Sequence, residues 1–591
     1  MKAYTLKSCL RSTRKGKRTL ALLVALPLAP LAVQAQAPAW QKAVSVAVNN
    51  NFYAGTEGVT ATAADASGNV YLVGSFSGTA TFGNITVTST SSTGNSFVAK
   101  WSPANGFLWA KSISGASANA VAVSGASVYV AGTFFGTTEF GTTRLASLGI
   151  SDAFVFKLTD AGSSASFAWA QRAGGSSIDN ATAVAVNGTN VYVTGGFSSI
   201  AADFGSTTLA NSGPNSNRNL LNDVFIAKLT DAGTSASFAW AQRAGGTGPD
   251  TPAALAVNGT SIYVAGQFNG NEAGFGGTIL ASANTNNDVF VAKLTDAGAS
   301  GSFAWAQRAG GTGYDAAKAL AVSGTNVYIA GEIASPTAAF GGTSLISTGS
   351  SNAFVAKLTD VGASGNFTWA QRAGGAGANV ARALAVRGAD VYVAGAFSGS
   401  AADFGRTKLA SFGGNTSIFG GDDVFVAKLT DAGASGSFAW AQRAGDAGAD
   451  AAEALTLSGG TVYVTGSFAG SKIAFGSTVL TKTSASSTDG SGFLAALTDV
   501  ASTQATTALL VDVAPHPNPA QGATAVTLPA GSQARLVLTN AMGRVVRVQN
   551  VKLSATEPTT AQLSLAGLVS GPYQLRVQAN GESGTHMLAI D

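Results

Sequence analysis

The segment VFVAKLTDAGASGSFAWAQRAG runs from Val289 to Gly310, and the same letters return from Val424 to Gly445. A catalytic motif normally occurs once per active site, so verbatim repetition points to architecture. VFVAKLT and FAWAQR are short runs rich in β-branched or aromatic residues, and DAGASGS between them has turn chemistry. The segment therefore predicts two β-strands joined by a hairpin, built more than once.

The repeat extends over most of the chain. Four aromatic markers recur: the Trp of FAWAQR, the Tyr of VYVAG, the Phe of FG and the Phe of FVAK. Each series has seven members spaced 57 to 71 residues apart. With the runs ALAV and VYVAG each repeat holds four strands and no helical periodicity. The sequence thus predicts an all-β fold, a seven-bladed β-propeller.

The rings are interpreted as structural wedges between neighbouring blades, in preference to ligand stacking, because each buries a large area. The tryptophans of this series are Trp40, Trp109, Trp169, Trp240, Trp305, Trp369 and Trp440.

The order of the markers predicts how the ring closes. The series opens with a lone Trp strand, AWQKAVSV from Ala39, and ends with GFLAALTD at Gly492, after which no Trp strand follows. The last blade therefore lacks its outer strand, and the start of the chain holds a spare one. We expect residues around Trp40 to pair with residues around Phe493.

These motifs resemble a bacterial repeat family. NVYVTGGF, ADFG, DVFIAKLTDAG and FAWAQRAGG are similar to the seven-bladed β-propeller repeat named for that fold, the SBBP repeat, over about Trp40 to Asp499. The resemblance implies the propeller fold and an extracellular or surface setting, and it implies no single activity. The propeller is expected over residues 38–499.

The N-terminus reads as a secretory signal peptide over residues 1–37. Seven Lys or Arg residues precede the apolar run TLALLVALPLAPLAV and the small-residue site AVQAQA. Cleavage would remove the only cysteine, Cys9, and would leave 27 basic against 30 acidic residues. Without a basic patch nucleic acid is not an expected partner, and no later stretch is apolar enough to predict a transmembrane segment.

The last part of the chain differs from the repeats. Residues 500–510 read as a polar linker, and residues 511–591 contain alternating runs broken by Gly and Pro, which predict a small β-sandwich. Three motifs resemble the C-terminal sorting domain of type IX secretion substrates: Pro517-Asn518-Pro519, Gly543-Arg544, and Leu568 to Tyr573 with Gly571 inside it. The resemblance implies outer-membrane secretion machinery as a partner, then release or attachment to surface lipopolysaccharide.

One set of oxygen-bearing side chains is a candidate site. These residues follow the AGG of successive repeats, where loops would surround the mouth of a central channel. A ring of carboxylates and amides there would hold a cation such as calcium, or a polar ligand; alternatively, each caps its own turn. The set is Glu57, Asn119, Asp179, Asp250, Asp315, Asn379 and Asp450.

Other chemistry is sparse. The two histidines, His516 and His586, lie in the tail, so a propeller triad or His-based zinc site is not expected. The Asp of LTD falls in a hairpin turn and is interpreted as structural. Longer loops offer Arg218, Asn219, Phe412 and Phe419 as contact residues. LTD supplies Asp160, Asp231, Asp296, Asp360, Asp431 and Asp499.

Two functions follow from these features. The first is an exported, non-catalytic module for binding, adhesion or scaffolding, with an extracellular glycan or protein as ligand and no cofactor. The alternative is a secreted carbohydrate-active hydrolase or lyase, which needs two carboxylates roughly 5–10 Å apart. Nothing in the near-identical repeats singles out one such pair.

Overall fold

The computed structural model describes residues 37–48, 58–89, 91, 94–213, 221–412, 421–482, 491–499, 515, 518–528, 533–540, 544–554, 557, 559–579 and 582–591. Residues 1–36 of the expected signal peptide, Glu57 and the expected linker lie outside them. All 48 elements are β-strands, and no helix occurs in the described ranges. The all-β class is confirmed.

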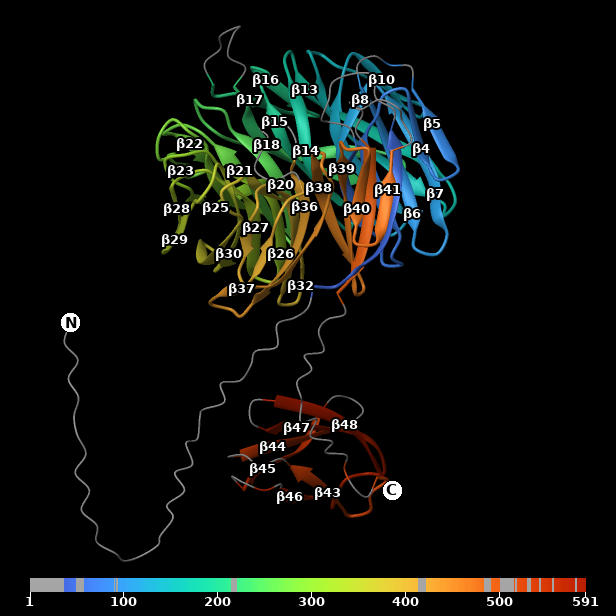
Figure 1. Ribbon diagram of the computed structural model, residues 1–591, viewed down its shortest axis with the longest axis vertical. Helices are drawn as coiled ribbons and strands as arrows, with labels where there is room; N and C mark the ends of the chain where they lie inside the picture. The colour runs from blue at the N-terminus through green and yellow to red at the C-terminus, as the bar shows by residue number, and fades with distance from the viewer. Residues whose placement is uncertain are drawn as a thin grey trace, which may run out of the picture.

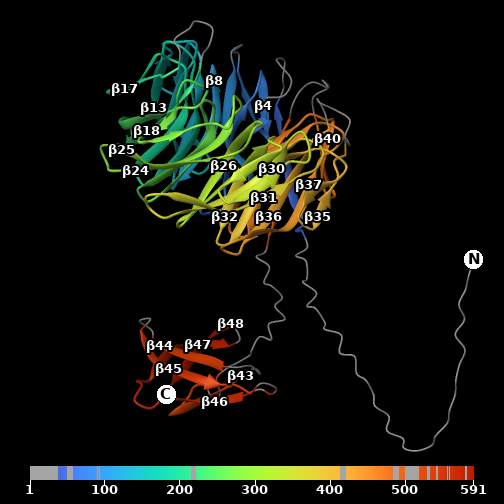
Figure 2. The same cartoon turned by 90° about the vertical axis from the view of Figure 1, so that its left-hand side faces the viewer.

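Seven sets of four antiparallel strands make up most of this part of the chain (Figures 1 and 2), and we number them sheets 1 to 7. Their strands are, for sheet 1, β2(Gly58–Ala64), β3(Val70–Ser75), β6(Asn95–Ser102) and β7(Gly106–Ser114); for sheet 2, β8(Ala116–Ser124), β9(Ser127–Phe134), β12(Asp152–Asp160) and β13(Ala165–Gly175); for sheet 3, β14(Asp179–Asn187), β15(Asn190–Phe197), β18(Asp223–Asp231) and β19(Ala236–Ala244); for sheet 4, β20(Thr251–Asn258), β21(Ser261–Phe268), β24(Asp288–Asp296) and β25(Gly301–Ala309); for sheet 5, β26(Asp315–Ser323), β27(Asn326–Ile333), β30(Asn352–Asp360) and β31(Gly365–Ala373); for sheet 6, β32(Asn379–Arg387), β33(Asp390–Phe397), β36(Asp423–Asp431) and β37(Gly436–Ala444); and for sheet 7, β38(Asp450–Ser458), β39(Thr461–Phe468), β42(Ser491–Thr498) and β1(Trp40–Val48).

A short hairpin lies between the second and third strand of every repeat, and in six repeats it pairs with the outer strand of the preceding sheet. The hairpins are β4(Thr79–Phe82) and β5(Ile85–Thr88), β10(Thr137–Phe140) and β11(Thr143–Ala146), β16(Ala201–Phe204) and β17(Thr207–Ala210), β22(Ala273–Phe275) and β23(Thr278–Leu280), β28(Thr337–Phe340) and β29(Thr343–Ile346), β34(Ala402–Phe404) and β35(Thr407–Leu409), and β40(Lys472–Phe475) and β41(Thr478–Thr481).

Sheet 7 is completed by the first strand of the chain. β1 pairs antiparallel with β42, with Val44 opposite Leu494 and Ser45 opposite Phe493. The first strand of each sheet contacts the first strand of the next sheet, and β38 of sheet 7 contacts β2 of sheet 1. In Figure 1 the orange strands β39–β41 accordingly lie beside the blue strands β4 and β6. The contacts between sheets thus return to their starting point.

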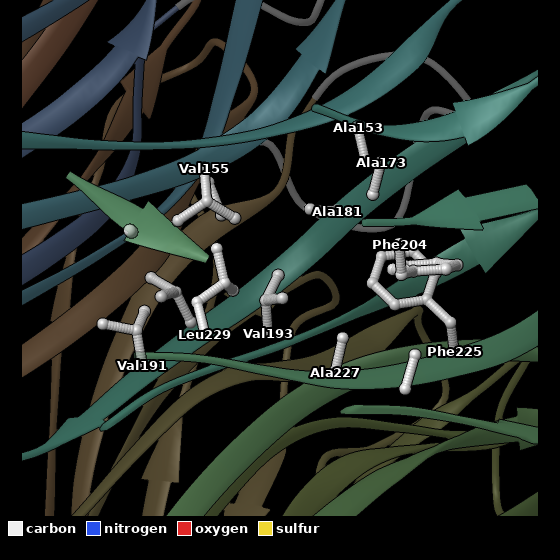
Figure 3. Close-up of a cluster of buried hydrophobic side chains, with 14 of the residues drawn as sticks. Ala153, Val155, Ala173, Ala181, Val191, Val193, Phe204, Phe225, Ala227 and Leu229 are labelled. Carbon is white, nitrogen blue, oxygen red and sulfur yellow. The ribbon is translucent and has the colours of Figure 1, made fainter. Parts of the chain in front are cut away.

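The core lies between neighbouring sheets. Figure 3 shows one such layer, in which Val155 of sheet 2 faces Val193 and Leu229 of sheet 3. Phe204 of a hairpin and Phe225 of β18 lie in the same layer, 4.8 Å apart between ring centroids. The seven marker tryptophans are 2–9% exposed. Each therefore adds apolar area to a layer between sheets, as large rings do in cores.

A polar cluster, which we call the junction clasp, joins each of the first six sheets to the next. At the junction of sheets 2 and 3, Asp231 accepts hydrogen bonds from Lys157 Nζ at 2.6 Å, Tyr129 OH at 2.7 Å and Trp169 Nε1 at 2.9 Å. Asp231 Oδ1 also accepts from the Gly233 amide at 2.8 Å, which closes the predicted turn. The LTD aspartate therefore bonds to its own backbone and to the preceding sheet.

The same Lys–Asp and Tyr–Asp bonds recur at the other clasps. Their aspartates are Asp160, Asp296, Asp360, Asp431 and Asp499.

The described part of residues 515–591 forms two sheets that share one buried cluster, including Leu536, Leu563 and Leu575. A two-stranded sheet holds β43 and β46, and a four-stranded sheet has the order β45-β44-β47-β48. The strands are β43(Ala523–Leu528), β44(Gln533–Asn540), β45(Val545–Lys552), β46(Thr559–Ser564), β47(Gly571–Ala579) and β48(Glu582–Ile590).

Candidate functional site

The predicted acidic ring lies at the start of the first strands, but its side chains are buried. Asp179, Asp250, Asp315, Asn379 and Asp450 are at most 1% exposed. Asp179 Oδ2 accepts hydrogen bonds from the Gly175 amide and the Ser199 hydroxyl, both at 2.6 Å. The turn-capping alternative fits these contacts, and the ligand role stays a prediction.

Burial shapes the acidity of these groups. It raises the pKa of Asp250 to about 7, although the Gly246 amide opposes the shift. Burial likewise raises the pKa of Asp450 to about 8, with Asp423 nearby as a second cause. The Oδ1 atoms of Asp423 and Asp450 have no partner among the described residues. No cluster of three or more Asp, Glu, His or Cys side chains suited to a metal occurs in the described ranges.

Asn119 does not belong to this set. The position equivalent to Asp179 in sheet 2 is Ala116, which pairs with Phe134 as Asp179 pairs with Phe197. Asn119 lies three residues further along β8, where the pairing register shifts between Ala118 and Ala120. Its side chain therefore occupies a β-bulge, a device that re-aims a side chain away from the regular alternation.

The bulge is present in the first strand of all seven sheets. In sheet 3 the shift falls between Ala181 and Ala183, and the Cβ that any other residue would add at Gly195 would meet the Asn180 carbonyl oxygen at 1.9 Å. The Gly of VYVAG is thus required by the bulge. The bulged residues are Thr60, Asn119, Thr182, Ala253, Lys318, Arg382 and Glu453.

These seven residues vary in type and charge among the repeats, whereas the residue that follows each of them is Ala in every repeat. In the sequences VTATAA, ANAVAV, ATAVAV, PAALAV, AKALAV, ARALAV and AEALTL the second letter alone changes in charge. Several bulged side chains reach to the next sheet: Asn119 Nδ2 donates to the Ala181 carbonyl at 2.8 Å, and Arg382 Nη1 lies 3.0 Å from Glu453 Oε1. Loss of repeat symmetry at one position was the signal that the sequence analysis missed.

A cavity of about 470 Å³ lies beside four of the bulged residues, Thr60, Asn119, Arg382 and Glu453. This volume is within the range of about 300–1,000 Å³ for small-molecule sites. Besides these four residues, Val59, Phe76 and glycine backbone, the wall is formed by Ser75, Asn95, Ser117, Ala118 and Ser467. The cavity is therefore lined by sheets 1, 2, 6 and 7, where the start and end of the repeats meet.

Of the weaker loop candidates, Arg218, Asn219 and Phe419 lie outside the described residues. Phe412 is 53% exposed, and the Arg443 guanidinium lies 3.9 Å above its ring. His516 and the side chain of His586 also fall outside the described part of the chain.

Among the sorting-motif residues, Pro517 and Gly543 lie outside the described ranges. Asn518 Oδ1 accepts a hydrogen bond from the Ala589 amide at 2.8 Å, and Pro519 follows it. The Arg544 amide donates to Asn540 Oδ1 at 3.0 Å. Gly571 begins β47, and Tyr573 OH donates to the Val569 carbonyl at 2.8 Å. The described motif residues thus hold turns and the last strand in place.

Residues 515–591 match the family model of the secretion system C-terminal sorting domain. The sorting-domain resemblance is therefore confirmed. The chain is a type IX secretion substrate, exported to the cell surface or the extracellular medium, and its tail interacts with the secretion machinery. Among the described residues there is no helix that is long and apolar enough to cross a membrane.

No curated protein matches the chain. Among solved structures, an acylaminoacyl peptidase from Pyrococcus horikoshii is 8% identical, with a TM-score of 0.35; the match covers 70% of this chain and half the length of the peptidase. PorZ, a surface component of the type IX secretion system of Porphyromonas gingivalis, is 12% identical over 90% of this chain and 82% of PorZ, with a TM-score of 0.19. At these TM-scores neither similarity indicates a shared function.

Proposed function

We propose that residues 38–499 form a seven-bladed β-propeller of the SBBP-repeat type, joined by a linker at 500–510 to a sorting domain at 511–591. Seven four-stranded sheets, the pairing of β1 with β42 and the contact of β38 with β2 support this architecture. Class averages of the purified protein in electron micrographs should display seven spokes; six or eight spokes would reject it.

The proposed function is binding without catalysis at the cell surface or in the extracellular medium. The observation that carries it is the set of bulged residues: the repeats keep their buried aromatic residues but vary in charge at this position, and four of the seven bulged residues line a cavity. Variable side chains on a rigid frame are how binding surfaces acquire specificity.

The geometry favours binding over the hydrolase alternative. Catalytic carboxylates must reach the substrate, whereas Asp250 and Asp450, whose pKa values are raised, are buried beneath their loops. Glu453 is the acidic side chain on the cavity wall, and Arg382 pairs with it. After export the module would be released or attached to surface lipopolysaccharide, where it would meet an extracellular glycan or protein.

A thermal-shift screen of small polar compounds tests this function on the full-length chain. A cavity ligand at about 100 times its Kd should stabilise the protein by about 2.7 kcal/mol. The stabilisation should vanish in Glu453→Ala and persist in Thr182→Ala, which changes a bulged residue away from the cavity. Turnover of a polysaccharide or peptide by the purified chain would contradict the proposal.

A further inference from the structure

The cavity carries no net charge on its wall. Its two ionised side chains are Arg382 and Glu453, which are 40% and 28% exposed and bonded to each other at 3.0 and 3.1 Å. A charged ligand would gain attraction from one member of the pair and meet repulsion from the other. The wall therefore suits a neutral ligand.

The same wall has hydrogen-bonding capacity to spare. Arg382 uses Nη1 for both oxygens of Glu453, which leaves its other N–H groups as donors. Asn119 donates to Ala181, which leaves its Oδ1 as an acceptor. The hydroxyls of Ser117 and Ser467 have no hydrogen bond within the described part of the chain. Such groups are costly to cover with an apolar ligand, so the ligand must both donate and accept.

The apolar members of the wall offer little to a hydrophobic side chain. Phe76 and Val59 are 2% and 1% exposed, so their surface is already covered by protein. An apolar peptide side chain would therefore gain little from these two residues. Hydroxyl groups, which donate and accept from one atom, match a wall of mixed donors and acceptors.

We propose that the cavity between sheets 1, 2, 6 and 7 binds a neutral saccharide, with Arg382 and Glu453 as its charge-assisted hydrogen-bonding pair and Asn119, Ser117 and Ser467 as further contacts. This inference rests on the proposed binding function and adds the class of ligand. The mutual hydrogen bonds of Arg382 and Glu453 hold both side chains in one orientation before the sugar arrives, which lowers the entropy lost on binding. Ion-paired groups also form stronger hydrogen bonds to hydroxyls than neutral groups do.

The test uses the full-length chain and calorimetric titration with three probe sets: neutral gluco- and manno-oligosaccharides, oligosaccharides of uronic acids, and uncharged tetrapeptides. A neutral oligosaccharide should bind best. Glu453→Gln should weaken its binding by about tenfold or more, because one charge-assisted bond is lost. Thr182→Ala, a bulged residue away from the cavity, should change it less than about twofold.

The outcomes separate the two proposals. If uronic-acid oligosaccharides or tetrapeptides bind more tightly than neutral oligosaccharides, and Glu453→Gln weakens that binding, the ligand is not a neutral saccharide. The proposed binding function would still stand. Binding of a neutral saccharide that Glu453→Gln and Asn119→Ala leave unchanged would overturn the site. The absence of binding by all three probe sets, with each variant as stable as the parent chain to heat, would count against the proposed function itself.

Discussion

Six junctions between sheets are held by a buried clasp, and the seventh, where sheet 7 meets sheet 1, is not. At that junction Ala496 stands where the other sheets have the clasp lysine, and Pro103 stands where they have the clasp aspartate. Both charges are missing together, so neither is left buried and unpaired. The junction instead packs Trp101 edge-on against Tyr463 at 5.9 Å, with Lys42 of β1 4.9 Å above Trp101.

The difference separates junctions that depend on a buried charge pair from one that packs aromatic rings instead. A buried charge pair needs both partners in place, because one charge left alone is costly. The junction of sheets 7 and 1 has no such pair. There β1 pairs with β4, as the outer strands of five other sheets pair with the next hairpin, and the ladder of β1 with β42 completes sheet 7 itself.

Removal of β1 should have the largest effect. Deletion of residues 38–48 leaves β42 as an unpaired edge and exposes the layer that Trp40 covers. We expect the free energy of unfolding to fall by more than about 5 kcal/mol, with aggregation through the open edge. Urea unfolding followed by tryptophan fluorescence measures this loss. An unchanged midpoint would show that β1 is not part of the fold.

Breaking one clasp should come next. Asp360→Ala leaves the Lys293 ammonium buried without its partner and removes the acceptor of Tyr263 and Trp305. The expected cost is about 3–5 kcal/mol in urea unfolding. A matched control is Asp403→Ala, which removes an exposed carboxylate and should cost less than about 0.5 kcal/mol. Equal losses in the two variants would remove the distinction between clasp and surface.

Building a seventh clasp should show coupling of intermediate size. Ala496 is buried, so Ala496→Lys alone buries a charge without a partner and should destabilise the chain. Pro103 is exposed, so Pro103→Asp alone should cost less. The double variant should recover about 1–3 kcal/mol relative to the sum of the single changes. A double-mutant cycle in urea gives this coupling. Additive losses would mean that the closing junction differs from the others in backbone geometry as well as in charge.

The clasps should also make stability depend on acid pH. Burial would raise the pKa of Asp360, but hydrogen bonds from Lys293, Tyr263 and the Gly362 amide outweigh it and lower the pKa below its ordinary value. Because the pKa of Asp360 in the folded state lies below the unfolded value of 3.8, the ionised carboxylate stabilises the fold above pH 3.8. This stabilisation is lost as the pH falls through the folded-state pKa. The stability difference between the parent chain and Asp360→Asn, measured in urea, should shrink by about 1–2 kcal/mol between pH 6 and pH 3. A constant difference would mean that Asp360 is not ionised in its clasp.

The smallest effect is expected from Lys42→Met. Lys42 is exposed, donates to the Pro103 carbonyl at 3.3 Å and lies above Trp101. Contacts of this kind contribute about 0.5–1 kcal/mol at exposed sites. Because the partners of Lys42 are a carbonyl oxygen and an indole ring, neither of which titrates, the loss in thermal stability should be the same at pH 3 and pH 6, in contrast to the clasp variant. A loss above about 3 kcal/mol would place Lys42 among the clasp lysines in importance.

Much of the fold followed from sequence because repetition multiplies weak signals. VYVAG or FAWAQR alone is an ambiguous apolar run, but seven copies at matched spacing define strands and turns, and the unmatched Trp strand at Trp40 predicted the pairing with β42. The sequence predicted the turn within the junction clasp but not the bonds that join it to the preceding sheet. LTD has the local chemistry of a turn, whereas its bonds to Lys and Tyr cross 60 to 107 positions in sequence.

The candidate site was harder to predict for a related reason. Asp179 and its counterparts stand out by residue type, yet burial depends on loops that the sequence does not place. The bulge depends on a register shift within one strand. In the sequence it is marked only by the glycine of VYVAG on the neighbouring strand and by a residue of variable type that precedes an alanine. Asn119 was therefore grouped with Asp179 although it belongs with Arg382 and Glu453.

The most direct test of closure is a cysteine pair at the junction of the chain ends. Ala43 lies opposite Ala495 in the ladder of β1 and β42, and Cα atoms of directly opposed antiparallel residues are about 4.5–5.5 Å apart, within disulfide range. Once the leader with Cys9 is removed, Ala43→Cys/Ala495→Cys should form an intramolecular disulfide under mild oxidation, seen as faster migration on a non-reducing gel. Ala43→Cys/Ala427→Cys, with the second cysteine in sheet 6, should not. No crosslink in the first variant, or crosslinks only between molecules, would contradict the closed ring.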